Sequence, residues 1–539
     1  MAVESLMAAS AYGYPLLIKQ IFLSARALSS DREIVYQDRR FGYPAFFDRV
    51  ARLAHALAAL GVRPGDTVAV MDWDSHRYLE AFFAVPMMGA VLQTVNVRLS
   101  PDQIAYTLND AGAGALLIHD DFVPILTTIR ERLQTVRCVV SLTDTEAGGQ
   151  AGTHGEYESL LARAQPVFDF PDLDENTRAT TFYTTGTTGD PKGVFFSHRQ
   201  LVLHTLADAA ALGSPVAQGR LHRGDVYMPM TPMFHVHAWG LPYVATLLGL
   251  SQIYPGRYAP DALLRLIRDE GVTFSHCVPT ILHMLLNHAD AAATDLSACK
   301  LIIGGSALPQ GLAQAALDRG IDVFTGYGMS ETCPILTLAH LRDAAVDPAE
   351  ALRDRTRTGY AIALVQVRVV DDDLHDVPAD GASVGEIVVR APWLTQGYLN
   401  KPDASESLWR GGWLHTGDIG TLDARGMLTV TDRLKDVVKT GGEWVSSLAL
   451  EDVISRHPAV TEVAVVAVPD ARWGERPLPL VVLKPGHASD ADALRAHVQT
   501  AVDAGVLSRF AVPDQIRFVD SLPRTSVGKL NKRAMREAL

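Results

Sequence analysis

Residues 183–193 have the composition of a loop that holds a polyphosphate. They read Y-T-T-G-T-T-G-D-P-K-G, with four threonines, three glycines and one lysine. Glycines let the backbone approach an anion and turn its N–H groups toward it, and threonine hydroxyls add further donors. The lysine, Lys192, supplies a mobile positive charge. The run is not a Walker motif, because the G-x-x-x-x-G-K-[ST] spacing and its helix are absent. A flexible turn is the alternative.

Two further segments follow predicted strands and expose backbone to a flat ligand. Residues 304–309 (G-G-S-A-L-P) follow an apolar run at 301–303, and residues 326–332 (G-Y-G-M-S-E-T) follow a shorter one. Parallel sheets bind ligands at this carboxyl edge. Tyr327, between two glycines, can lie against a base, and Glu331 offers a hard oxygen for magnesium. A simple turn and a capped helix start are the respective alternatives.

Two segments in the last third of the chain carry single charged groups. Residues 411–418 read G-G-W-L-H-T-G-D, and a carboxylate such as Asp418 in a Gly-rich turn can accept both hydroxyls of a ribose. An Asx turn is the alternative there. Residues 523–529 read P-R-T-S-V-G-K. A lysine so close to the chain end is usually a solvated surface charge, and a catalytic role for Lys529 is the other interpretation.

Alternating helices and strands must position these segments. Such alternation predicts parallel sheets flanked by helices, in two α/β blocks. The first block is predicted from helices at 46–60, 76–88 and 101–111 and strands at 67–71, 91–95 and 114–118. The second is predicted from helices at 261–270, 279–288 and 310–318 and strands at 273–277, 300–303 and 321–324.

The chain changes character after residue 357. Short strands at 365–370, 385–390 and 426–430, separated by Gly, Asp and Pro turns, predict a small β-rich subdomain, which we expect to be a distorted barrel. A compact α+β piece then follows. Its predicted elements are helices at 449–456 and 490–503 and strands at 461–468, 478–483 and 515–519. The junction at 432–436 (D-R-L-K-D) is a charged segment that suits a hinge, with a surface turn as the alternative.

Bulk composition excludes several classes of protein. A chain of 539 residues predicts two or more domains, and 48% hydrophobic with 20% charged residues is typical of a soluble globular protein. The formal net charge of −13 argues against a nucleic-acid partner. Four cysteines without a CxxC pair indicate reduced thiols. We find neither a signal peptide nor an integral membrane segment, and expect a cytoplasmic protein.

Taken together, in this order and spacing, the segments resemble the adenylate-forming superfamily of acyl-CoA synthetases, luciferases and peptide-synthetase adenylation domains. The resemblance covers essentially the whole chain. It implies an α/β multidomain fold, with a large N-terminal domain of two α/β subdomains plus a β-barrel. The small α+β C-terminal domain is expected to be mobile and to carry the catalytic lysine. We place the ATP- and acyl-binding domain at residues 1–434 and the C-terminal domain at 435–539.

The resemblance also implies a reaction. The family activates a carboxylic acid with ATP to an acyl-adenylate and transfers the acyl group to a thiol, so ATP and CoA are the expected co-substrates and Mg²⁺ the cofactor. Thr184 and Glu331 match the metal-binding positions. The positions that match ATP-binding residues are Thr184, Thr185, Gly186, Thr187, Thr188, Lys192, Gly305, Ser306, Ala307, Gly326, Tyr327, Gly328, Met329, Ser330, Asp418, Arg433 and Lys435.

Catalytic and acyl-binding positions are carried over in the same way. Lys529 matches the family lysine that bridges carboxylate and α-phosphate, and Lys435 matches the hinge, where other members carry Asp. The expected catalytic set is Lys529, His235, Glu331 and Lys439. The expected acyl- and CoA-binding set is His235, Val236, Trp239, Gly240, Gly441, Gly442, Glu443 and Trp444. His237 departs from the related enzymes, which often have Asn, and a core or surface histidine is its alternative interpretation.

Residues 89–99 and 442–444 are most similar to bacterial medium- and long-chain acyl-CoA synthetases and to 3-methylthiopropionyl-CoA ligases. The implied substrate is a short- to medium-chain fatty acid or 3-methylthiopropionate, and the implied assembly is a homodimer. An aryl-CoA ligase, or an adenylating enzyme that loads a carrier protein in trans, is the alternative. A luciferase-type oxygenase is a further alternative, whereas a non-catalytic binding protein is disfavoured because no core chemical position is lost.

Overall fold

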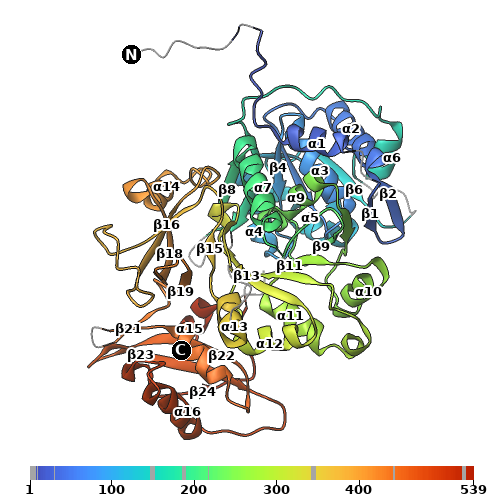
Figure 1. The fold of residues 1–539 in the computed structure, drawn as a ribbon. Coiled ribbons are helices and arrows are strands. Elements are labelled where there is room, and N and C mark those ends of the chain that lie inside the picture. Colours follow the sequence, from blue (N-terminus) through green and yellow to red (C-terminus); the bar gives the residue numbers. More distant parts are fainter. Residues whose placement is uncertain are drawn as a thin grey trace.

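The computed structural model describes residues 8, 10–28, 31–145, 152–184, 190–216, 218–341, 347–440, 443–524 and 530–539, with only the backbone of Glu443. Figure 1 shows a large upper part, which holds the N-terminal and middle regions, and a smaller lower part formed by the last hundred residues. Among the described residues, no helix is long and apolar enough to cross a membrane.

The first α/β block forms a six-stranded sheet in the order β6-β5-β3-β4-β7-β8. All neighbours in it are parallel except β7 and β8, which form an antiparallel pair. Its strands are β3 (Thr67–Met71), β4 (Val91–Thr94), β5 (Ala113–His119), β6 (Cys138–Leu142), β7 (Arg178–Thr184) and β8 (Lys192–Ser197). Its helices are α2 (Tyr43–Ala59), α3 (His76–Met87), α4 (Pro101–Asp110), α5 (Val123–Ile129), α6 (Tyr157–Arg163) and α7 (His198–Gly213). The predicted parallel block is therefore confirmed.

The second block is larger than predicted. Its nine-stranded sheet has the order β15-β14-β13-β12-β11-β9-β10-β1-β2, so an N-terminal hairpin completes a sheet built mainly from residues 226–361. Its strands are β1 (Glu33–Tyr36), β2 (Arg39–Gly42), β9 (Val226–Pro229), β10 (Ser251–Tyr254), β11 (Phe274–Cys277), β12 (Lys300–Ile303), β13 (Asp322–Gly328), β14 (Ile335–Leu338) and β15 (Tyr360–Ala361). The helices of this region are α8 (Val236–Trp239), α9 (Leu241–Leu248), α10 (Pro260–Glu270), α11 (Pro279–Asn287), α12 (Gln310–Asp318) and α13 (Pro348–Thr356), and α1 (Ile18–Ala27) packs on α9.

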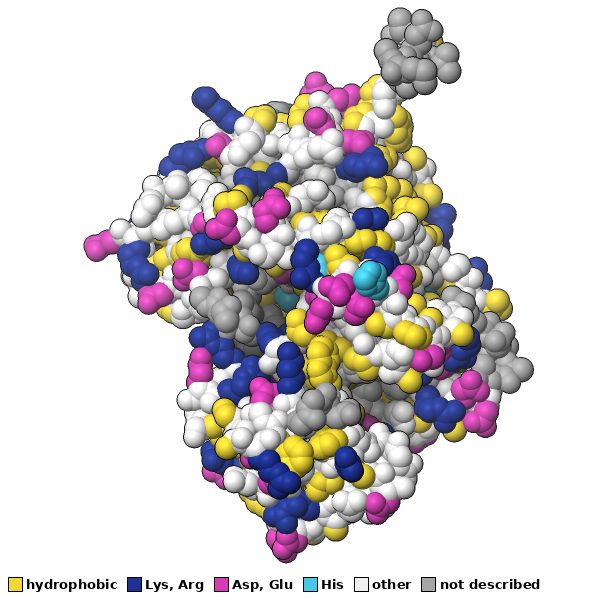
Figure 2. Space-filling view, turned by 90° about the vertical axis from the view of Figure 1, so that its left-hand side faces the viewer, with side chains coloured by type: hydrophobic (Ala, Val, Ile, Leu, Met, Phe, Trp, Pro, Cys, Tyr) yellow, Lys and Arg dark blue, Asp and Glu magenta, His cyan; other side chains and the backbone are white. Residues whose placement is uncertain are grey.

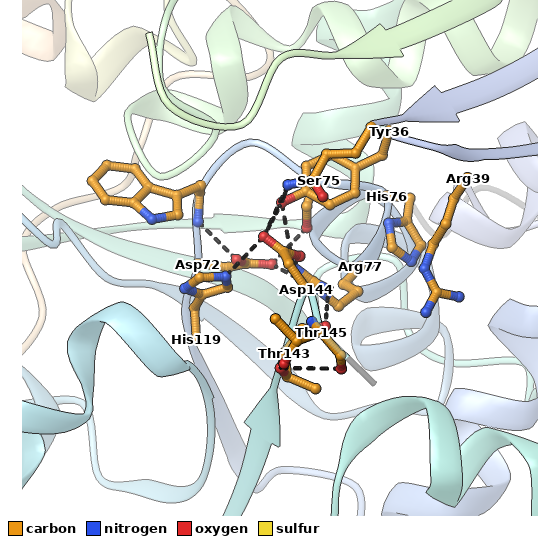
Figure 3. A network of polar contacts seen from close by, with 12 residues as sticks. Tyr36, Arg39, Asp72, Ser75, His76, Arg77, His119, Thr143, Asp144 and Thr145 are labelled. Carbon is orange, nitrogen blue, oxygen red and sulfur yellow. Dashed lines mark hydrogen bonds and ion pairs between the residues drawn. The ribbon is translucent and has the colours of Figure 1, made fainter. Parts of the chain in front are cut away.

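A polar network joins these two sheets where their strand ends meet (Figure 3). Arg77, at the start of α3, is buried and donates to Asp144 Oδ1 at 2.8 Å and to Asp72 Oδ2 at 3.2 Å. Tyr36 of β1 donates to the other oxygen of Asp144 at 2.9 Å, and the His119 ring lies 3.1 Å from the same oxygen. Because its polar groups bond mainly to one another, this network serves as a structural link between the sheets.

A small β-rich region follows after residue 360, as predicted, and its strands are antiparallel. Four strands form a sheet in the order β16-β17-β18-β19, from Gln366–Val370, Gly385–Arg390, Leu414–Leu422 and Leu428–Arg433, with α14 (Pro402–Leu408) beside it. The predicted barrel is not confirmed, because these strands form a path with two ends rather than a closed ring.

The last part of the chain is the predicted α+β piece. Its five-stranded sheet has the path β21-β20-β23-β22, with β24 paired to β23. The strands are β20 (Val438–Thr440), β21 (Glu443–Val445), β22 (Val460–Asp470), β23 (Gly474–Leu483) and β24 (Arg517–Phe518). The helices are α15 (Ser447–Ser455), α16 (Ala491–Asp503) and α17 (Lys532–Glu537). Its apolar core, around Leu450, Val465 and Leu494, is separate from the cores of the larger part.

Candidate nucleotide and acyl site

The threonine-rich run lies between two strands, as its flanking residues predict. β7 ends at Thr184 and β8 begins at Lys192, and these two residues are register partners. β7 is parallel to β4, so the run leaves the sheet at its carboxyl edge, where open α/β sheets bind ligands. Thr185, Gly186, Thr187 and Thr188 lie outside the described residues.

Tyr398 connects the lysine of this run to Glu331. The Lys192 ammonium lies 4.7 Å from the centre of the Tyr398 ring, and the Tyr398 hydroxyl donates to Glu331 Oε1 at 2.6 Å. Glu331 sits in a 3-10 turn, Ser330–Thr332, in which Thr332 Oγ1 accepts from the Met329 N–H. Burial raises the pKa of the Glu331 carboxyl, opposed by the Tyr398 hydrogen bond and by the charges of Lys192 and Arg433. Sequence reasoning missed Tyr398, which lies in no recognisable motif.

A second polar group forms where β13 faces β18 and β19. The Tyr327 hydroxyl donates to Asp418 Oδ2 at 2.8 Å, and Arg433 Nε lies 3.3 Å from Asp418 Oδ1. Asp418 and Arg433 are register partners, so the antiparallel pairing of two strands sets their contact. Burial and the Asp418 carboxylate raise the pKa of the Tyr327 phenol. Each carboxylate oxygen has two lone pairs, so Asp418 retains acceptor capacity for a ligand hydroxyl.

Glycines bring the backbones of β12, β13 and the following segments close together. A Cβ on Gly304 would lie 2.8 Å from the Gly326 carbonyl oxygen and 2.8 Å from the Trp239 ring, and a Cβ on Gly328 would lie 1.7 Å from the Pro334 oxygen. Gly305, Ser306 and Ala307 follow β12 as an exposed loop. The structure therefore places this exposed loop after β12 and Tyr327 on the neighbouring strand, β13.

The segment predicted to form the acyl site contains an unexpected left-handed turn, Val236–Trp239, which we call the gate turn. Its four φ angles are 48°, 55°, 48° and 59°, and Gly240 continues the series at 76°. Left-handed geometry costs an L-residue roughly 1–2 kcal/mol, and such outliers concentrate at functional sites. His235 precedes the turn, with its N–H bonded to the Pro232 carbonyl. Trp239 is buried against Gly304 and packs at 5.0 Å from the His276 ring.

His237, at the second position of the gate turn, lies in the core. Its ring is surrounded by those of Phe82, Phe182, Phe196 and Tyr243, with centroids 5.3–6.3 Å away. Burial lowers the pKa of this histidine to about 3. Of the two interpretations left open by the sequence, the buried position is the observed one.

The C-terminal candidates form a separate group. Lys439 of β20 pairs with Trp444 of β21, and its ammonium lies 5.2 Å from the centre of the half-exposed indole. Gly441, Gly442 and Lys529 lie outside the described residues. At the junction, Lys435 is exposed and lies in sequence between Arg433 and Asp436, and partial desolvation followed by the Arg433 charge lowers its pKa. Asp436 pairs with Arg536 of α17 at 2.8 Å.

Positively charged side chains gather on one part of the molecular surface (Figure 2). Figure 2 shows Lys and Arg side chains beside the hollow between the upper and lower parts of the molecule. In a chain with a net charge of −13, such local positive charge is what a polyanionic ligand would require.

Comparisons with known proteins agree on one family. Residues 22–399 match the model of the AMP-binding enzyme family, and residues 449–529 match that of the AMP-binding enzyme C-terminal domain. A long-chain-fatty-acid–CoA ligase of Thermus thermophilus is 40% identical over 95% of this chain and 94% of its own length. A 3-methylmercaptopropionyl-CoA ligase of Ruegeria pomeroyi is 37% identical over 91% and 90%. Among solved structures, ATP-bound MatB of Rhodopseudomonas palustris is 26% identical, with a TM-score of 0.81 over 96% and 98% of the chains.

Proposed function

This chain belongs to the AMP-binding enzyme family, and on that premise we propose that it is an ATP-dependent acyl-CoA ligase. It converts a carboxylic acid, ATP and CoA to acyl-CoA, AMP and diphosphate through an acyl-adenylate. The observation that carries this proposal is two groups of contacts. Tyr398 joins Lys192 to Glu331, and Asp418 joins Tyr327 to Arg433. They supply a cation for phosphate and a carboxylate for ribose hydroxyls from six separate segments of the chain.

ATP would span these contacts. We propose that the exposed loop at 305–307 and Tyr327 enclose the adenine, together with Gly326, Gly328, Met329 and Ser330. Asp418 would accept the ribose hydroxyls, and Arg433 would hold its carboxylate in place. The run from Thr184 to Lys192 would bind the β- and γ-phosphates of ATP. These two phosphates leave together as diphosphate.

The residues present fit a Mg²⁺ ion. One buried carboxylate, Glu331, with the hydroxyl of Thr184 and phosphate oxygens is a typical oxygen donor set for this cation. A series of contacts connects Thr184 to Glu331. Thr184 is the register partner of Lys192. The Lys192 ammonium lies against the Tyr398 ring, and the Tyr398 hydroxyl donates to Glu331. When bound, the ion would neutralise part of the phosphate charge.

The first half-reaction is the attack of one anion on another. A carboxylate oxygen of the acid bonds to the α-phosphorus and the bond to the diphosphate breaks, so positive charge and positioning provide most of the catalysis. We propose that Lys529 stabilises the oxygens at the reacting phosphorus electrostatically. His235 would close against the carboxylate, since it immediately precedes the gate turn that leads to Trp239.

The second half-reaction transfers the acyl group to CoA. The thiolate attacks the acyl carbonyl, and AMP leaves with the bridging oxygen. We propose that residues 435–539 rotate about Lys435 and bring the Lys439–Trp444 hairpin, with Gly441, Gly442 and Glu443, to the site. In support, Lys435 lies between the Arg433 end of β19 and the Asp436–Arg536 pair, where the two parts of the molecule meet. Residues 1–434 would then form the domain that binds ATP and the acid.

The relatives support a proposal for the substrate class. The curated relatives are named for long-chain fatty acids, for medium-chain fatty acids and for 3-methylmercaptopropionate. We propose a short- to medium-chain fatty acid or 3-methylthiopropionate here, with Trp239 and Val236–Gly240 at the acyl site. An aryl acid, or a carrier-protein thiol in place of CoA, is the alternative. A cytoplasmic location and a homodimer remain predictions from the sequence. Sedimentation would measure the oligomeric state.

Product analysis tests the proposal. The protein is incubated with ATP, Mg²⁺ and each of a panel of acids from propionate to palmitate, 3-methylthiopropionate, benzoate and cinnamate, with CoA or with acyl carrier protein. We expect acyl-CoA and AMP in equal amounts with at least one aliphatic acid. Formation of ADP, or acyl transfer to the carrier protein alone, would contradict the proposal. Asp418→Ala should raise the KM for ATP, whereas Asp376→Ala, which removes an exposed carboxylate from a surface ion pair, is the matched control.

A further inference from the structure

Three buried polar side chains lie behind the gate turn and have no role in the proposed reaction. We call His204 and Asp208 of α7, together with His237, the buried polar cluster. All three are at most 1% exposed. The backbone of Gly240 lies between the cluster and Trp239. A Cβ on Gly240 would lie only 2.9 Å from His204 Nδ1, so no side chain fits between this backbone and the cluster. The acyl site and the cluster are therefore one backbone apart.

The cluster contains several polar atoms that have no hydrogen-bond partner among the described residues. Both carboxyl oxygens of Asp208 and both ring nitrogens of His237 are in this state. So is the indole N–H of Trp393, whose ring packs edge-on to His204 at 5.6 Å. Buried polar groups in native proteins are nearly always hydrogen-bonded, because leaving them unpaired is costly. A wall that contacts only an alkyl chain needs none of these groups.

His204 shows how the cluster is connected to the nucleotide strands. Its Nε2 accepts from the Ile335 N–H at 3.1 Å, so in the neutral ring Nδ1 carries the proton, and Nδ1 lies 3.4 Å from Asp208 Oδ2. Ile335 begins β14 and is the register partner of Gly328, one residue after Tyr327. The cluster thus contacts both the gate turn and the strands beside Tyr327, which is proposed to hold adenine.

The protonation states define what could bind. Burial raises the pKa of Asp208 well above its usual value and lowers the pKa of His204 and of His237 to about 3. Burial without a counter-charge therefore favours the uncharged form of each of the three groups. Asp208 and His237 then each offer one donor and at least one acceptor. A hydroxyl, which also donates and accepts, complements them, whereas an ionic group would lose its hydration without a counter-charge.

We propose that the buried polar cluster binds a hydroxyl group on the acyl chain and makes this enzyme selective for hydroxylated aliphatic acids. This inference rests on the proposed function, because the acid must first be bound as a ligase substrate. The Asp208 carboxyl and the His237 ring share the substrate hydroxyl, and His204 orients Asp208. The hydroxyl reaches them when the gate turn leaves its left-handed conformation and Gly240 moves away from His204.

Matched pairs of acids test the inference. The kcat/KM of the full-length enzyme is measured for hexanoate and for its 3-, 4-, 5- and 6-hydroxy derivatives, with butyrate and its hydroxy derivatives as a shorter series. We expect at least one hydroxy acid to exceed its unsubstituted parent by tenfold or more, because a site built to bond a hydroxyl discriminates strongly against an acid that lacks it. If every hydroxy acid is equal to or poorer than its parent, the inference is wrong.

Variants then connect any preference to the cluster. Asp208→Leu and His237→Leu should each lower the ratio of kcat/KM for hydroxy acid to parent acid at least tenfold, and Asp208→Asn, which keeps a donor and an acceptor, should retain most of it. Thr205→Val is the matched control: this neighbouring buried hydroxyl on α7 bonds the Leu201 carbonyl, so its ratio should equal that of the wild type. A ratio unchanged in Asp208→Leu and His237→Leu would show that the cluster only holds internal water, which overturns the inference.

The wild-type measurements alone decide the question if the leucine variants fail to fold. They also separate the two proposals. If neither hexanoate nor any hydroxy acid yields acyl-CoA, the proposed function itself fails. If hexanoate is activated and no hydroxy acid is preferred, only the hydroxyl site is rejected.

Discussion

Replacing Ala238 by glycine tests the left-handed gate turn directly. In a right-handed helix, an alanine-to-glycine change costs about 0.5–1 kcal/mol in backbone entropy, and losing a buried methyl costs about 0.8 kcal/mol more. Ala54 of α2 is fully buried in such a helix, so Ala54→Gly should destabilise the protein by about 1.5 kcal/mol. Ala238 is equally buried but has a φ of 48°.

The opposite backbone geometry changes the balance at Ala238. Glycine there loses the same methyl and the same entropy, but it removes a left-handed strain of roughly 1–2 kcal/mol. The two effects nearly cancel, so Ala238→Gly should lie within about 0.5 kcal/mol of the wild type. The predicted difference between the two substitutions is therefore about 1–2 kcal/mol, although both delete the same atoms from fully buried sites.

Urea unfolding followed by tryptophan fluorescence measures this difference. The two variants and the wild type are compared through their midpoints at a common slope m, so that a shift reports stability alone. We expect the Ala54→Gly midpoint to fall and the Ala238→Gly midpoint to stay near that of the wild type. Equal destabilisation by the two glycines would refute the left-handed turn, and with it the argument that the turn stores strain.

Three other predictions concern charge and the acyl site. Lys529→Ala should nearly abolish formation of the adenylate but largely spare thioester formation from supplied acyl-adenylate, which rapid-quench assays of each half-reaction would measure; equal loss in both would reject its role. Trp239→Ala should broaden the range of accepted chain lengths, and an unchanged kcat/KM profile would remove Trp239 from the acyl site. Burial opposes ionisation of the Asp144 carboxyl, but hydrogen bonds from His119 and Arg77 outweigh this effect and hold the pKa of Asp144 below its usual value. Burial likewise opposes protonation of the His119 ring, but its hydrogen bond to Asp144 and the charge of that carboxylate outweigh this effect and raise the pKa of His119. Asp144→Asn should therefore cost most stability between about pH 4 and 6.5. The cost should shrink as the pH falls below about 4, because the carboxyl of the unfolded chain takes up a proton there, and it should vanish below the lowered pKa of folded Asp144. The cost should also shrink as the pH rises through the raised pKa of His119. A pH-independent difference in urea midpoints would contradict this assignment.

Local sequence patterns predicted those helices and strands whose formation depends mainly on neighbouring residues in the chain. The strand–loop–strand arrangement around Lys192 follows from apolar residues on both sides of a Gly- and Thr-rich run. The helix α10 and the strand β12 follow from periodicity and lie within one residue of their predicted bounds. The hairpin of β1 and β2 was not predicted, because β1 pairs with β10, more than 200 residues away, and no local pattern specifies that partner.

The site was predictable in its residue types but not in its contacts. Glycine- and acid-bearing segments identified Glu331 and Asp418, whereas Tyr398, which bonds Glu331, lies in an unremarkable stretch and is brought there by tertiary packing. The gate turn escaped prediction because four consecutive non-glycine residues rarely adopt positive φ. Asp208 is likewise one acid in a helix of ordinary appearance, and only its complete burial distinguishes it.

Oxygen-isotope transfer tests the acyl-adenylate most directly. The enzyme is given hexanoate, or whichever acid it prefers, labelled with ¹⁸O in the carboxylate, together with unlabelled ATP, Mg²⁺ and CoA. Because a carboxylate oxygen attacks the α-phosphorus and stays with AMP when the thiol displaces it, we predict one ¹⁸O in AMP and none in diphosphate by mass spectrometry. Label in phosphate or diphosphate, or an AMP without label alongside acyl-CoA, would contradict the mechanism.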